Sequence, residues 1–120
     1  MILLAIFAAI NNKRSMDYFN TQEGSVTVCD KEGIILYMNQ KAIDTFGNKV
    51  GKNLFFCHPP QAQEKIHSLL KTGETNAYTI EKKGIKKIIF QTPWYTDGNI
   101  AGLIEYSFPI PFDMPHYKRG

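Results

Sequence analysis

Apolar and polar residues alternate in two short runs near the start of the chain, and the pattern predicts a β-hairpin. The segment Val26–Cys29 (VTVC) repeats with the period of two that is typical of a half-buried strand. A second apolar run covers residues 34–38. Gly33 lies between the two runs, where a tight turn requires a residue that tolerates positive φ.

The next two segments have the spacing of helices. Asn39 is a candidate N-cap, and Gly47 is placed to end a short helix after Phe46. A longer helix is predicted over residues 61–71, where apolar residues recur at i, i+4, i+7 and i+8. The apolar face of the first helix comprises Ala42, Ile43 and Phe46, and that of the second comprises Ala62, Ile66, Leu69 and Leu70.

Three further strands are predicted over residues 75–82, 86–95 and 100–108. Lys83-Gly84 and Asp97-Gly98-Asn99 separate them, and the second of these is a strong hairpin signal. Alternation places Tyr78 and Ile80 together on one face. It also predicts Ile88, Phe90, Ile104, Tyr106 and Phe108 as inward-facing, with Glu105 directed outward.

The first ten residues (MILLAIFAAI) predict an amphipathic N-terminal helix. The run is too short to span a membrane, and Lys13 and Arg14 follow it, whereas a signal peptide has its charge in front. We expect the helix to pack on the domain or on a second copy of the chain. A membrane-surface anchor and a targeting remnant are the alternatives.

Composition indicates one globular domain. The chain has 120 residues, of which 43% are hydrophobic and 21% charged, and the net charge is +3. This mild basicity is well short of the dense patches that nucleic-acid binding uses. The two cysteines, Cys29 and Cys57, do not make a disulfide framework, so we expect reduced thiols and a cytoplasmic protein.

The order of these elements, over about residues 24–108, resembles that of a PAS domain. The resemblance is carried by Ile35–Asn39 (ILYMN), Gly51-Lys52-Asn53, Thr72-Gly73-Glu74 and Asp97-Gly98-Asn99. The segment Asn76–Trp94, with Cys57-His58-Pro59 and Met114-Pro115-His116, is also similar to small bacterial PAS proteins without an attached effector.

The resemblance implies an α+β fold: a PAS-like five-stranded antiparallel sheet with short helices on one face, plus the N-terminal amphipathic helix. The expected organisation is an N-terminal helix (residues 1–20), a PAS domain (21–111) and a C-terminal tail (112–120). Family members hold haem, flavin or small metabolites between sheet and helices. The outer sheet face and the N-terminal helix usually make dimer contacts.

The leading hypothesis is a sensory, ligand-binding PAS module, expected to be a homodimer. Its small molecule would lie among apolar and aromatic residues, with polar or reactive contacts from Cys57 and His58. The expected ligand-binding residues are Phe46, Phe55, Cys57, His58, Tyr78, Phe90 and Tyr106. The alternative is an interaction module with a filled core that regulates a kinase or transcription factor, since a signalling protein is an expected partner.

The cofactor is left unknown. The position where haem-binding members carry their ligand holds Ala62, although His58 stays a candidate in another geometry. Leu54 occupies the position of the flavin-reactive cysteine, which disfavours covalent photochemistry but not flavin binding. Cys57, His58 and His67 lack the spacing of a credible metal site, so no metal site is expected.

No catalytic residue is predicted, and the chain is expected not to be an enzyme. Neighbours in sequence such as Cys57 and His58 rarely form a nucleophile–base pair, and no catalytic motif is present. Redox sensing by Cys57 is an alternative to the ordinary role of a buried thiol. The cluster of lysines at residues 82–87 is interpreted as a solvated hairpin that protects a sheet edge, rather than as a nucleic-acid site.

Overall fold

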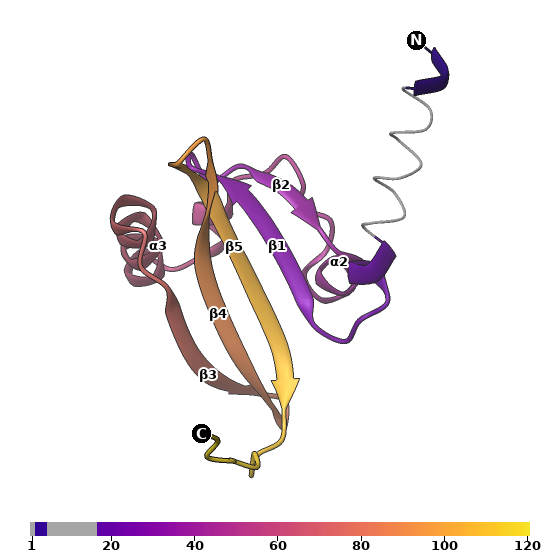
Figure 1. Cartoon of the computed structure of the whole chain (residues 1–120), viewed down its shortest axis with the longest axis vertical. Coiled ribbons are helices and arrows are strands. Elements are labelled where there is room, and N and C mark those ends of the chain that lie inside the picture. The colour runs from indigo at the N-terminus through magenta and orange to yellow at the C-terminus, as the bar shows by residue number, and fades with distance from the viewer. Residues whose placement is uncertain (1, 5–16) are drawn as a thin grey trace.

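The computed structural model describes residues 2–4 and 17–120. A single five-stranded sheet runs through it, with strands in the order β2-β1-β5-β4-β3 and every neighbouring pair antiparallel (Figure 1). The elements are β1 (Ser25–Asp30), β2 (Ile35–Met38), α2 (Gln40–Phe46), η1 (Leu54–Cys57), α3 (Pro60–Thr72), β3 (Asn76–Lys82), β4 (Ile85–Thr96) and β5 (Asn99–Ile110). The predicted α+β class and the five-stranded antiparallel sheet are therefore confirmed.

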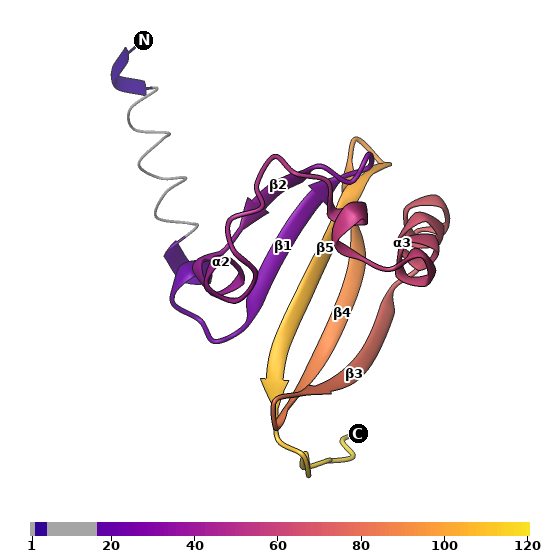
Figure 2. The same ribbon diagram turned by 180° about the vertical axis from the view of Figure 1, so that it is seen from behind.

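Local sequence explains where the short helices begin and end. The Asn39 side chain accepts a hydrogen bond from Ala42 N, which confirms it as the N-cap of α2. Asn53 caps η1 by accepting from Phe55 N at 2.9 Å. Pro60 starts α3, and Gly73 ends it with φ 78° in the left-handed region. Figure 2 shows α2, η1 and α3 on the same side of the sheet.

The core lies between this side of the sheet, which we call the inner face, and the helices. Cys29 of β1 and Leu103 of β5 are register partners on it, and both are buried against Ile66 and Leu69 of α3. The same buried cluster includes Ile35, Met38, Ala42, Leu54 and Phe55. Side chains two residues apart on a strand share a face, so Cys29 and Leu103 determine which other residues face inward.

The prediction of which side chains of β4 and β5 face the core was wrong by one residue. Counting from Leu103 in steps of two, Glu105 and Ser107 lie on the inner face, and their register partners Gln91 and Ile89 are buried there. The residues predicted as inward, Ile88, Phe90, Ile104, Tyr106 and Phe108, therefore lie on the opposite, outer face. A one-residue shift exchanges the faces completely, and both faces of these strands are rich in apolar residues, so alternation alone did not identify the inner one.

Little of the predicted N-terminal helix falls within the described residues. Residues 2–4 and 17–20 are helical, and the stretch between them lies outside the described part. At the other end, residues 111–120 contain no helix or strand. Within the described residues, every helix lacks the length and apolar character needed to cross a bilayer. The proposed division at residues 1–20, 21–111 and 112–120 stays a prediction.

Candidate ligand-binding cavity

A row of polar side chains crosses the middle of the inner face. Register aligns Asn76 of β3 with Gln91 of β4, Gln91 with Glu105 of β5, and Glu105 with Thr27 of β1. Asn76 Nδ2 donates to Gln91 Oε1 at 3.0 Å, and Gln91 Nε2 donates to Glu105 Oε2 at 2.8 Å. Adjacent strands thus hold the Glu105 carboxylate in one orientation.

His58 approaches the same carboxylate from the helical side. It is the C-cap of η1, and its ring Nδ1 lies 2.9 Å from the backbone oxygen of Leu54. The other ring nitrogen, Nε2, lies 3.8 Å from Glu105 Oε2, which is an ion-pair distance. Both nitrogens face acceptors, an arrangement that suits the doubly protonated ring.

Electrostatics favour the charged forms of both groups. The interaction with Glu105 raises the pKa of His58, more than burial lowers it. Burial by itself would raise the pKa of Glu105, but interactions with His58 and Gln91 outweigh it, and the net pKa is lowered. The two side chains are only 20% and 17% exposed, so this is a partly desolvated ion pair.

The Glu105–His58 pair lies at a cavity of about 470 Å³ between the sheet and the helical side. Its other walls are mostly apolar and come from β2, α2 and η1. The lining residues are Thr27, Ile35, Met38, Phe46, Lys49, Leu54, Phe56, His58 and Glu105. A second space of about 320 Å³ shares Phe46 and Glu105 with it and continues along the inner face past Tyr78. Apolar walls around a few fixed polar groups are typical of small-molecule sites.

The structure brings only some of the sequence-predicted site residues together. Phe46 and His58 line the cavity, and Tyr78 lines the adjoining space. Phe55 is a buried core residue whose ring contacts that of His67 in a tilted arrangement, at a centroid distance of 4.1 Å. Phe90 and Tyr106 lie on the outer face, with ring centroids 6.3 Å apart, and do not reach the cavity. The Cys57 side chain is outside the described part.

Sequence reasoning missed Glu105 and Thr27 as cavity residues. Alternation concealed Glu105, because a carboxylate between Ile104 and Tyr106 has the pattern of a strand residue that faces solvent. The pairing of β4 with β5 places Gln91 beside Glu105 on the inner face, and that pairing is a feature of the tertiary structure.

Among the described residues, no group of three His, Cys, Asp or Glu side chains is arranged to hold a metal ion. His67, the histidine of the long helix, packs on Phe55. The Glu105–His58 pair offers a carboxylate acceptor and an imidazole donor at the cavity wall.

Comparison with known proteins gives matches in structure. No protein-family model matches the chain, and no curated protein matches its sequence. The fold is similar to a C-terminal domain from Streptococcus mutans, with TM-score 0.66 and 22% identity over 81% of this chain and 83% of that one. It is also similar to the PAS domain of histidine kinase ThkA, with TM-score 0.60 and 21% identity over 72% of this chain and 99% of that one.

A third similar structure is the Vibrio cholerae VqmA dimer, with TM-score 0.65 and 20% identity. The match covers 82% of this chain and 51% of VqmA, so the chain spans about half the length of that protein. VqmA has also been solved bound to DPO. These relationships define an α+β protein with a five-stranded antiparallel sheet and its helices on one face. The fold is that of a PAS domain, as the sequence motifs predicted.

Proposed function

We propose that this protein is a sensory PAS module that binds a small molecule in the cavity between sheet and helices. The observation that carries the proposal is the cavity of about 470 Å³ at which apolar walls surround the Glu105–His58 pair. A partly desolvated ion pair costs free energy to bury. Its position at a cavity, rather than inside the packed core, favours a role in recognition. We propose binding and not catalysis.

The geometry favours a ligand with an apolar body and at least one N–H or O–H donor. Gln91 and His58 both approach Oε2 of Glu105, whereas Oε1 receives no hydrogen bond from any described residue. The Thr27 hydroxyl lies beside Glu105 in the register and lines the same cavity. A donor on the ligand would satisfy Oε1, while Ile35, Met38 and Leu54 would contact its apolar part. That VqmA binds DPO supports small-molecule sensing by this fold.

Native mass spectrometry of freshly purified protein, with an absorption spectrum of the same sample, tests the proposal. We expect a bound mass of a small organic molecule on the wild-type chain. Glu105→Gln keeps the shape of the side chain but removes its charge, so it should lower ligand occupancy about tenfold or more. Glu64→Gln, on the exposed face of α3, is the matched control and should retain the ligand.

Two results together would contradict the proposal. The wild-type chain would carry no bound mass, and no compound in a metabolite library would raise its melting temperature. They would favour the second candidate, an interaction module that acts on a signalling partner. The observation behind that candidate is the outer face, where Phe90, Tyr106 and Phe108 form a partly exposed aromatic cluster. The same surface is our proposed homodimer contact, a role supported by the dimeric state of VqmA.

A further inference from the structure

Two serine hydroxyls lie on the inner face, two residues along the strands from Thr27 and Glu105. Ser25 of β1 and Ser107 of β5 are direct register partners. The residues are 7% and 6% exposed, so both are more than nine-tenths buried. Neither hydroxyl makes a hydrogen bond with any described residue. Among the described residues, Tyr37 Oη is the one buried polar side-chain atom without a hydrogen-bond partner, so both serine hydroxyls reach the solvent of a pocket and are free to donate to polar atoms from outside the chain.

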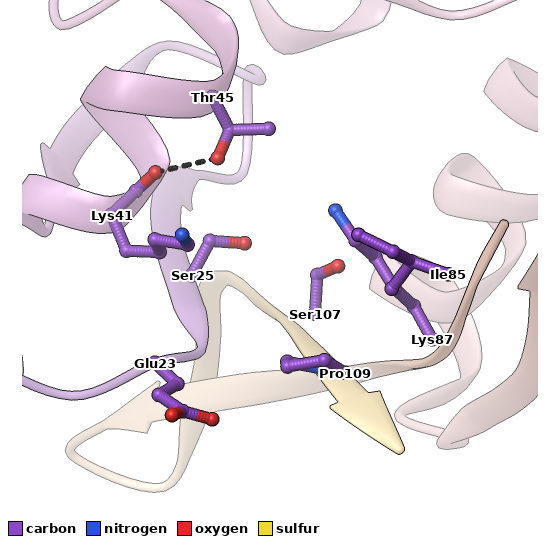
Figure 3. Close-up of a pocket in the computed structure, with 8 residues that line it drawn as sticks. All are labelled: Glu23, Ser25, Lys41, Thr45, Ile85, Lys87, Ser107 and Pro109. Atoms are coloured by element: carbon purple, nitrogen blue, oxygen red, sulfur yellow. Dashed lines mark hydrogen bonds between the residues drawn. The ribbon is translucent and has the colours of Figure 1, made fainter. Parts of the chain in front are cut away.

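Both serines open into a pocket of about 240 Å³ at the end of the inner face away from α3. Figure 3 shows their side chains between Lys41, which comes from α2, and Lys87, which comes from β4. We call this the serine–lysine pocket, and its remaining lining residues are Glu23, Thr45, Ile85 and Pro109. Residues of β1, α2, β4 and β5 thus contribute to one small site.

The charges around the pocket favour an anion. Neither Lys41 nor Lys87 forms an ion pair within the described part of the chain, so both ammonium groups are available. Lys82 and Lys83 line the adjoining space, which also includes Lys87, Ser107 and Thr45. The opposing charge at the rim is Glu23, whose carboxylate points away from the serines in Figure 3. Clustered ammonium groups beside hydroxyl donors match a group with several acceptor oxygens.

Lys87 does not have the role expected for the hairpin lysines. Register pairs it with Ile80 and Pro109 on the inner face, whereas the preceding Lys86 lies on the outer face and donates to the Phe112 backbone oxygen at 3.5 Å. Lys86 therefore lies on the outer face near the hairpin turn, in a strand that is flanked by β3 and β5 and is not a sheet edge. Both lysines are half-buried, and Lys87 is the one that lines the pocket.

We propose that the serine–lysine pocket binds a phosphate-type oxyanion, held by the ammonium groups of Lys41 and Lys87 and by the hydroxyls of Ser25 and Ser107. Two positive charges balance a dianion, and the two hydroxyls donate to separate oxygens of a tetrahedral group. This site does not depend on a ligand in the Glu105–His58 cavity, because none of its four binding residues lines that cavity.

A titration of the full chain with inorganic phosphate, followed by amide NMR at constant ionic strength, tests the site. We expect saturable shifts at the amides of Ser25, Lys41, Lys87 and Ser107. Lys87→Ala should weaken phosphate binding about tenfold, the loss of one charge-assisted contact. Ser25→Ala with Ser107→Ala should weaken it severalfold without changing the net charge. Lys65→Ala, on the exposed face of α3, is the matched control and should bind like wild type.

Three results would overturn the proposal, each in variants whose amide spectra retain the native dispersion. The first is the absence of saturation at tens of millimolar phosphate. The second is equal weakening by Lys65→Ala, which would show that only overall charge matters. The third is acetate binding as tightly as phosphate, which would contradict recognition of a tetrahedral dianion. The Glu105→Gln variant should bind phosphate normally, so failure here is distinguishable from failure of the proposed sensory function.

Discussion

At the residue scale, the charge states of His58 and Glu105 determine the electrostatics of the main cavity. The folded-state pKa of His58 is raised, so its stabilising contribution is complete below its ordinary value of 6.5 and is lost as pH rises through the raised pKa. The pKa of Glu105 is lowered, so its contribution is complete above 4.5 and is lost as pH falls through the lowered pKa. The ion pair therefore stabilises the fold most between about pH 4.5 and pH 6.5.

Glu105→Gln should lower the titration midpoint of the His58 ring, because the substitution removes the main cause of its raised pKa. It should also cost about 1–3 kcal/mol of unfolding free energy near pH 5.5, and less above the raised pKa of His58. NMR of the His58 ring signals measures the titration midpoint, and urea unfolding at two pH values measures the change in unfolding free energy. The ring signals of His116, in the exposed tail, are the internal control. An unchanged His58 midpoint would contradict the ion pair.

Cys29 should behave as a core residue and not as a reactive thiol. Burial raises its pKa to about 11, and it packs against Leu103 on the inner face. In a Cys57→Ser background, a thiol reagent at pH 8 should leave native protein almost unlabelled and should label one thiol after unfolding. Rapid labelling of the native protein would show that this part of the core opens readily.

At the scale of elements, one asparagine joins three segments of chain. Asn39 is fully buried, and its Oδ1 accepts from Val26 N at 2.9 Å and from Ala42 N at 3.0 Å. Its Nδ2 donates to the backbone oxygens of Phe19 at 2.7 Å and Gly24 at 2.9 Å. The cap of α2 thus also positions the start of β1, and with it Ser25 and Thr27.

Asn39→Ala should destabilise the protein by at least about 3 kcal/mol, because it leaves four backbone groups without their partner in a buried place. Urea unfolding measures the change. Asn48→Ala is the matched control, since Asn48 is exposed and its side chain accepts a single hydrogen bond, from Val50 N. A cost below about 1 kcal/mol would mean that water replaces the lost contacts.

At the scale of the whole molecule, the two faces of the sheet have different expected roles. The inner face holds the core, the ion-pair cavity and the serine–lysine pocket. The outer face carries the aromatic cluster of Phe90, Tyr106 and Phe108, in which neighbouring ring centroids are 6.3 and 5.8 Å apart. An aromatic surface that is partly exposed on one chain is suited to a contact between copies.

Phe90→Lys should convert the expected dimer to a monomer, because a charge would enter an apolar interface. Phe90 is 38% exposed, so the substitution leaves the core between sheet and helices intact. Light scattering coupled to size exclusion measures the mass at tens of micromolar chain. Tyr117→Lys, in the tail, is the control and should remain dimeric. A wild-type monomer, or a dimer that survives Phe90→Lys, would contradict the proposed interface.

The amino-acid sequence determined the elements and their order. Asn39 and Gly73 mark helix ends through local hydrogen bonding and backbone conformation, and Asp97-Gly98-Asn99 marks the last hairpin for the same reason. These signals act over a few residues, so they are readable without knowledge of the fold. The α+β class followed from the resemblance of that order to a PAS domain.

Only the tertiary structure decided which face of β4 and β5 is inner, because that depends on where α3 packs. Both faces of these strands carry apolar residues, so alternation was satisfied in either register. In the structure, Glu105, Ser107 and Lys87 lie on the inner face. Glu105 is therefore beside His58, and Ser107 and Lys87 share a pocket with Ser25 and Lys41. Both candidate sites combine residues from strands and helices that are distant in the chain. Such sites depend on long-range pairing, which local sequence patterns do not determine.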